Sequence, residues 1–88
     1  MSSKYQPLAD YLLSLESQTR EISLSFSELE KILGSTLPKS AIDHRPWWGN
    51  QRDSKNRPQA AAWMSSGFEV EDVDQRKPGG RVLFRRVG

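Results

Sequence analysis

The chain has 88 residues, no cysteine, and 13 Lys and Arg against 11 Asp and Glu, which gives a net charge of +2. This composition excludes a disulfide framework, a thiol nucleophile and a thiolate metal site, and no apolar run approaches the roughly 20 residues that span a bilayer. The length is enough for one domain, which buries only roughly 60% of its unfolded surface. We therefore expect a soluble cytoplasmic protein with a single domain over residues 1–88 and an ordered core at about 5–87.

The first predicted element is an amphipathic helix in YQPLADYLLSLES, in which Pro7 suits the first helical position. Its apolar residues fall at the spacing i, i+3, i+4 and i+7: Leu8, Tyr11, Leu12 and Leu15. A short half-buried strand is predicted next, in EISLSF, because Ile22, Leu24 and Phe26 alternate with polar residues.

A second helix is predicted directly after this strand. Ser25 and Glu28 have the spacing of a capping box at its start, and Ser27 with Glu30 offers a second register of the same cap. The apolar stripe is expected at Leu29, Ile32 and Leu33. Gly34 is the expected C-terminal stop.

A short helix is expected in the next segment, STLPKSAIDHRPWW. It would begin near Pro38, with Ser35 or Thr36 as its cap, and end near His44 because Pro46 limits its length.

A longer helix is predicted in PQAAAWMSS, beginning at Pro58 and ending before Gly67. Its apolar face carries Ala60, Trp63 and Met64. Two strands follow, FEVEDV and RVLFRRV, and the Pro78-Gly79 pair between them is typical of the centre of a type II turn. The chain is therefore expected to end in a β-hairpin.

The order helix, strand, helix, short helix, helix and β-hairpin indicates an α+β fold of the winged helix-turn-helix type. In such a fold the early strand would add to the hairpin, the helices would cover one face of the sheet, and the hairpin would be the wing. Residues 35–57 replace the usual turn of roughly three or four residues between helices, so a different small α+β arrangement is the alternative.

Charge is distributed unevenly along the chain. Residues 1–43 hold four Lys and Arg and six Asp and Glu, a net charge of −2, whereas residues 44–88 hold nine and five, a net charge of +4. A basic half favours a surface that meets an anion, most often nucleic acid, although small domains also acquire such asymmetry by chance.

Several segments together resemble a small bacterial and phage domain family of unknown function: YQPLADYLLS, LSFSELEKILGSTLPKSA, WWGN, QAAAWMSSGFEVEDVD and VLFRR. The resemblance extends from Tyr5 to Arg86. Members are about this length and are found alone or joined to nuclease-like and other DNA-related proteins. The resemblance supplies no activity and no catalytic residue; the positions that match its motifs are Trp47, Trp48, Asn50, Ala60 and Trp63.

The segment DHRPWWGNQRDSKNRP places two adjacent tryptophans, Trp47 and Trp48, among cations. The cations are Arg45, Arg52, Lys55 and Arg57. Aromatic faces stack on bases while cations bind phosphates, so this segment is a predicted nucleic-acid-binding surface. The alternative is that at least one of the two rings belongs to the core. At most one ring of such a pair usually points inward from a regular element, so the other could still lie in a binding surface. Trp63, on the apolar face of its helix, is assigned to the core.

Five further polar residues complete the predicted surface. Asn50 and Gln59 are amides that fit an adenine edge, although a turn role and a capping role are the alternatives. Arg76, Lys77 and Arg81 flank the hairpin turn and are predicted to contact phosphates from the wing, with solubilising charge as the alternative.

Neither an enzyme nor a metal or cofactor site is expected. His44 is the only histidine and has no ligand cluster around it, and the acidic residues of EVEDVD are expected on the wet face of a strand. The predicted function is a non-catalytic nucleic-acid-binding module, with DNA as the expected ligand. The alternative is a protein-interaction module that docks a nuclease or toxin partner through the Trp and Arg segment.

Overall fold

The computed structural model describes residues 4–50, 58–76 and 79–87. Over this part of the chain the elements follow in the order α1 (Gln6–Leu13), β1 (Glu21–Ser25), α2 (Phe26–Leu33), α3 (Lys39–Asp43), the 3-10 helix η1 (Arg45–Trp48), α4 (Pro58–Met64), β2 (Phe68–Asp74) and β3 (Arg81–Arg86). The predicted α+β class is confirmed. None of the described helices is long and apolar enough to cross a membrane.

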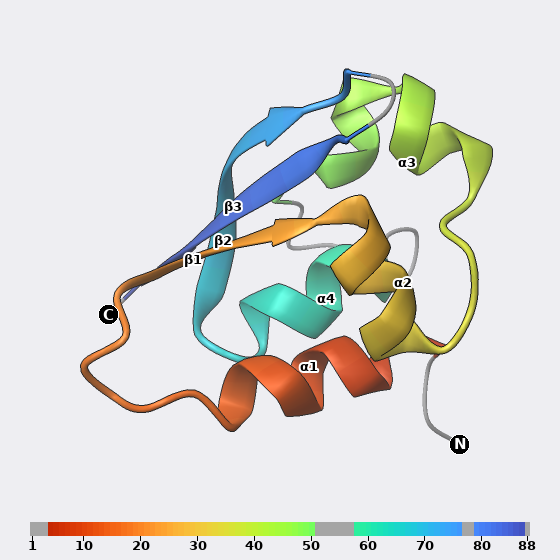
Figure 1. The fold of residues 1–88 in the computed structure, drawn as a ribbon. Coiled ribbons are helices and arrows are strands. Elements are labelled where there is room, and N and C mark those ends of the chain that lie inside the picture. The colour runs from red at the N-terminus through yellow and green to blue at the C-terminus, as the bar shows by residue number, and fades with distance from the viewer. Residues whose placement is uncertain (1–3, 51–57, 77–78, 88) are drawn as a thin grey trace.

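The three strands form one antiparallel sheet in the order β1-β3-β2, so the early strand adds to the C-terminal hairpin as the sequence predicts. Helices α1, α2 and α4 lie on one side of this sheet, and α3 lies beside the end of β2 (Figure 1). The opposite face of the sheet exposes side chains from two strands, including Glu21, Ser23, Arg81 and Arg85.

A β-bulge in β2 explains why Val73 faces the core together with Phe68 and Val70. The register against β3 shifts between Val70 and Asp72. Phe68 and Val70 obey the two-residue period of a strand, but Val73 is three residues further on, and the extra residue of the bulge returns its side chain to the same face. The sequence alone gives no sign of where this irregularity falls.

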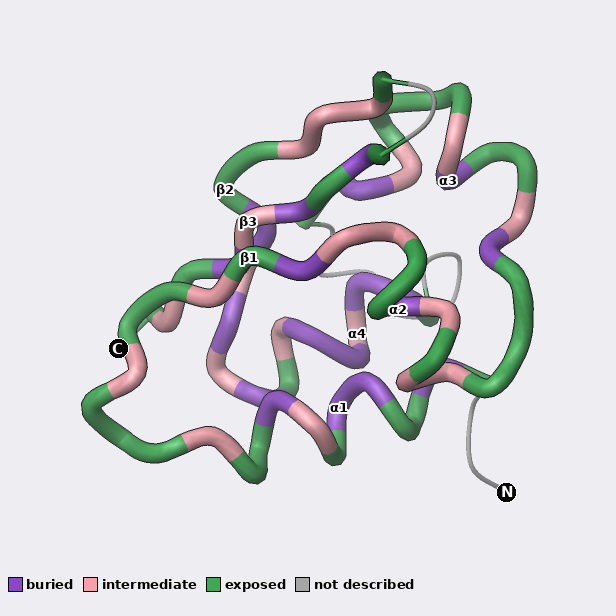
Figure 2. The backbone as a smooth tube through the Cα atoms, viewed as in Figure 1, coloured by how far each residue is buried: buried purple, intermediate pink, exposed green. Residues whose placement is uncertain are grey.

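The core draws residues from every helix and strand, and the buried segments of the chain turn toward one another between the helices and the sheet (Figure 2). A column of aromatic rings runs through it. The ring centroids are 5.9 Å apart for Phe26 and Trp48, 5.8 Å for Trp48 and Trp63, and 5.8 Å for Trp63 and Phe84. Such pairs stabilise a fold beyond the apolar area that they bury.

Helix α2 begins and ends as predicted, and the structure selects the first of the two possible caps. Glu28 N donates to Ser25 Oγ at 3.0 Å and Ser25 N donates to Glu28 Oε1 at 2.9 Å. Gly34 closes the helix in the left-handed conformation, with φ of 74°.

The predicted cap of the short helix α3 is wrong. Pro38 occupies the N-cap position and no side chain caps the helix, so neither Ser35 nor Thr36 has this role. The carboxylate of Glu30 instead accepts a bond from Leu37 N at 2.8 Å, which fixes the chain just before α3. The 3-10 helix η1 that follows was not predicted.

Candidate nucleic-acid interface

The two adjacent tryptophans have different environments. Trp48 is 1% exposed, and its Nε1 donates to Ala41 O at 2.8 Å. Because both faces of its ring are packed against Phe26 and Trp63, Trp48 cannot stack on a base, and its predicted place in the binding surface is corrected to a core role. Trp47 is only half-buried and lies edge-on to Trp48.

Asn50 is committed to the fold rather than available to a base. Its Oδ1 accepts bonds from Trp63 Nε1 at 2.9 Å and from Val70 N at 2.8 Å, and its Nδ2 donates to Val70 O at 2.9 Å. The side chain thus takes the place of a neighbouring strand beside Val70 and satisfies the buried indole N–H of Trp63. The predicted reading of an adenine edge by Asn50 is therefore wrong.

Gln59 is also a structural residue. Its side chain is buried, and its Nε2 donates to Trp47 O at 3.1 Å. This bond ties the start of α4 to η1, so the predicted adenine contact is corrected to a structural role. Two amides close in sequence to tryptophans could have indicated this structural role, because a buried indole N–H or backbone carbonyl requires a polar partner.

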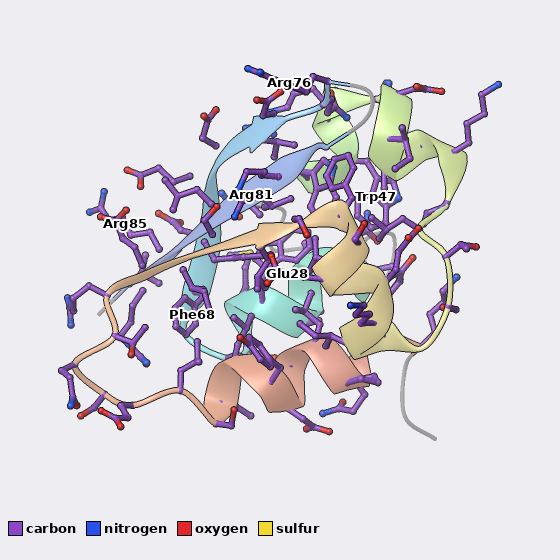
Figure 3. The ribbon with its side chains drawn as sticks, viewed as in Figure 1. Glu28, Trp47, Phe68, Arg76, Arg81 and Arg85 are labelled. Atoms are coloured by element: carbon purple, nitrogen blue, oxygen red, sulfur yellow. The ribbon has the colours of Figure 1, made fainter. Side chains whose placement is uncertain are left out.

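The two described cations predicted for the wing have partners within the protein. Arg76 Nε lies 2.8 Å from Asp74 Oδ2, and the backbone N–H of Arg76, followed by its guanidinium, holds the pKa of the Asp74 carboxyl below its usual value. Arg81 Nε donates to Ser23 Oγ at 3.1 Å, on the open face of the sheet rather than at the tip of the hairpin (Figure 3). Lys77 lies outside the described residues.

Lys and Arg side chains without a partner among the described residues occur on α3 and η1, and also at Arg20 and Lys31. Lys39, His44 and Arg45 are exposed, and within the described chain the side chains of Lys39 and Arg45 have no hydrogen bond or ion pair. Sequence reasoning missed Lys39 and His44, although a lysine on the first turn of a short exposed helix was a readable signal. The predicted contacts Arg52, Lys55 and Arg57 lie outside the described residues.

The hairpin tip and α3 are neighbours in space. Gln75 Nε2 donates to Ala41 O at 3.1 Å, which joins the end of β2 to α3. A pocket of about 180 Å³ lies between these elements and the start of α2. Its walls are Ser25, Phe26, Ser27, Ile42, Arg76, Gly79 and Gly80. We call the basic side chains of α3, of η1 and of the residue between them, together with Arg76 on the pocket wall, the α3 end: Lys39, His44, Arg45 and Arg76.

A search for metal-ligand clusters over residues 4–50, 58–76 and 79–87 finds no group of three His, Cys, Asp or Glu that could hold an ion. The α3 end offers positive charge, and its Arg45 shares the short helix η1 with the partly exposed Trp47. Positive charge and an aromatic edge can bind an anionic or aromatic ligand. The residues of the α3 end do not pair a nucleophile with an oriented base.

Comparison with known proteins gives one family. The family described as Domain of unknown function (DUF7662) matches residues 5–88. No curated protein and no solved structure matches significantly. The family description assigns no activity, so an account of function has to start from the geometry of the α3 end.

Proposed function

Because the chain belongs to the DUF7662 family, whose description assigns no function, we propose its role from the structure: it is a non-catalytic module that binds DNA through the α3 end. The observation that carries this proposal is the contrast between two sets of cations. Lys39 and Arg45 are exposed without a partner among the described residues, whereas the described arginines of the hairpin all have protein partners.

An unpaired surface cation contributes little to stability, but it gains free energy by neutralising a phosphate and releasing counterions. Arg45 also lies near the start of a basic stretch of the sequence. Residues 44–57 contain four Lys and Arg and one Asp, a net charge of +3. The free cations of the α3 end are therefore continuous along the chain with Arg52, Lys55 and Arg57, which stay predicted contacts.

The element order and the sheet order β1-β3-β2 support a winged helix-turn-helix type of docking. In this proposal α4 does not read the major groove. Its residues Gln59, Ala60, Ala62 and Trp63 are buried, and it carries no cation. The contact with DNA is assigned to α3 and η1, with the hairpin tip beside them, and Trp47 contributes an aromatic edge.

The test is a fluorescence-anisotropy titration of double-stranded and single-stranded oligonucleotides over a range of salt concentrations. The variant Lys39→Ala with Arg45→Ala should bind DNA more weakly, and its log–log salt slope should be shallower by about 2 × 0.9, or about 1.8. The matched control, Arg20→Ala with Lys31→Ala, removes the same charge from exposed positions outside the α3 end and should leave the slope nearly unchanged. Equal effects of the two pairs would show that only net charge matters and would refute this interface.

The same titration tests the adjoining segment. Replacing Arg52, Lys55 and Arg57 by Ala should make the slope shallower by about 3 × 0.9, or about 2.7, while circular dichroism stays unchanged. A protein that binds no oligonucleotide at low salt would reject the DNA proposal. It would favour the alternative, in which the tryptophan and arginine segment docks a protein partner, because such an interface depends little on salt.

A further inference from the structure

The free edge of β1 has open backbone groups. In an antiparallel pair, alternate residues direct their N–H and C=O groups toward the partner strand and the others direct them away. Two backbone bonds fix this alternation: Phe26 N donates to Gly80 O at 2.9 Å, and Arg86 N donates to Arg20 O at 2.7 Å. Glu21 and Ser23 therefore direct their N–H and C=O groups away from β3, to the open edge of the sheet.

The rest of the sheet edge is partly closed by side chains. On β2 the Asn50 amide occupies both backbone groups of Val70. At the end of β1 the Glu28 carboxylate occupies Ser25 N. Among the described residues nothing occupies the edge groups of Glu21 and Ser23. Uncovered strand edges are templates for pairing with another chain, so this short stretch is the exposed docking edge of the sheet.

We propose that the β1 edge pairs with β1 of a second copy of this chain, in an antiparallel two-fold arrangement centred on Ile22. In this register Glu21 lies opposite the second copy's Ser23, and Ser23 lies opposite the second copy's Glu21. Both are residues whose backbone groups point outward, so each pair exchanges two backbone hydrogen bonds. The two three-stranded sheets become one continuous sheet.

The side chains on the open face of the sheet are complementary in this register. Ser23 Oγ already accepts a bond from Arg81 Nε, so the guanidinium of Arg81 lies beside Ser23. Glu21 is exposed, and its carboxylate has no partner within the described chain, although Arg85 is its cross-strand neighbour. Arg85 instead contacts Glu71 at 3.3 Å. The second copy therefore brings its Ser23 and Arg81 to the free carboxylate of Glu21.

The opposite face of β1 is also self-complementary. Ile22 is only half-buried by its own chain, and the two-fold axis places it against the second copy's Ile22. In this register Ile22 packs against the second copy's Ile22, and Glu21 lies near the second copy's Arg81. Residues of like charge do not lie directly opposite each other. A contact between two five-residue strands is small compared with the roughly 1,200 Å² of stable complexes, so the dimer should dissociate on dilution.

This proposal is independent of DNA binding and is tested without nucleic acid, by sedimentation velocity over a wide range of protein concentration. The native chain should shift from monomer toward dimer as concentration rises. Ser23→Pro removes the outward N–H, which no bond among the described residues uses, and should stay monomeric. Its matched control, Ser23→Ala, also loses the hydroxyl but keeps the N–H, and it should still dimerise.

A second pair of variants keeps the test decisive if proline disturbs the strand. Glu21→Arg brings a cation toward the second copy's Arg81, which lies beside its Ser23, and should raise the dimer dissociation constant at least tenfold. Glu69→Arg makes the same change of charge on the other edge strand, opposite the same Arg85, and should leave the dissociation constant unchanged. A native chain that stays monomeric at every concentration, or equal effects within either pair of variants, would overturn the proposal.

Discussion

At the scale of single residues, Asn50 connects three parts of the molecule that are distant in sequence. It follows η1, bonds to the edge of β2 and accepts the indole N–H of a residue on α4. Buried polar groups without partners are costly, so one amide at the margin of the core prevents three such losses.

Replacing Asn50 by Ala should therefore lower the free energy of unfolding by about 1–3 kcal/mol, because Trp63 Nε1 and both backbone groups of Val70 lose their partner. Urea denaturation followed by circular dichroism measures this loss. The control is Gln18→Ala, which removes an exposed amide bonded only to Glu16 Oε2 and should change stability by less than about 0.5 kcal/mol. Equal midpoints for both variants would contradict the structural role of Asn50.

Gly80 is a second residue whose size is fixed by a neighbour. A Cβ atom at this position would clash with the Phe26 ring, which is stacked on Trp48 and would have to shift. Gly80→Ala should thus destabilise the protein by about 1–3 kcal/mol through overpacking. In a double-mutant cycle the cost should be smaller when Phe26 is Leu, and additive losses would show that this contact is not the cause.

At the scale of elements, the start of α2 depends on a charged cap. The backbone N–H of Ser25, followed by its side chain, lowers the pKa of Glu28 below its ordinary value of 4.5. A lowered folded pKa means that the ionised carboxylate stabilises the fold above the ordinary value. This contribution is lost as the pH falls through the folded pKa.

Glu28→Gln should accordingly have a lower thermal midpoint than the native protein at neutral pH. The difference should disappear at a pH well below 4.5, where the native Glu28 is also uncharged. Differential scanning calorimetry at several pH values measures it. A gap that persists unchanged in acid would show that the charge of Glu28 is not what stabilises the cap.

At the scale of the whole molecule, the radius of gyration is 12.0 Å. This is the value of about 12 Å expected for a compact chain of this length. A core this small has few large side chains, and the aromatic column joins α2, η1, α4 and β3 through it. Trp48 stands in the middle of that column and also bonds α3 through its Nε1, so its loss should affect the entire fold.

Trp48→Ala should cost about 3–5 kcal/mol, a large part of the stability of a domain this size. Trp47→Ala should cost clearly less, because Trp47 is only partly buried and packs at the margin of the core, against Tyr5 and Trp48 among others. Thermal unfolding of the two variants side by side checks the order. Equal and large losses would place both rings in the core and would remove Trp47 from the candidate interface.

The sequence by itself determined the elements whose signals are local. The apolar spacing around Leu8 and Leu12 determined α1, the cap of Ser25 and Glu28 with Gly34 bounded α2, and two alternating segments around a Pro-Gly turn determined the hairpin. Each of these features depends on contacts within a few residues, and periodicity and capping chemistry record such contacts directly.

Only the tertiary structure determines which predicted site residues are exposed and which are held within the fold. The burial of Trp48 depends on the rings of Phe26 and Trp63 packed against it. Whether Asn50 is free depends on Val70, 20 residues further along the chain. Arg81 is held by Ser23 across 58 residues. Contacts between such distant positions leave no periodic trace in a single sequence, and an amide or a guanidinium has the same letter whether it faces a ligand or its own backbone. Folding therefore determines whether such a side chain is available to a ligand or bonds within the protein.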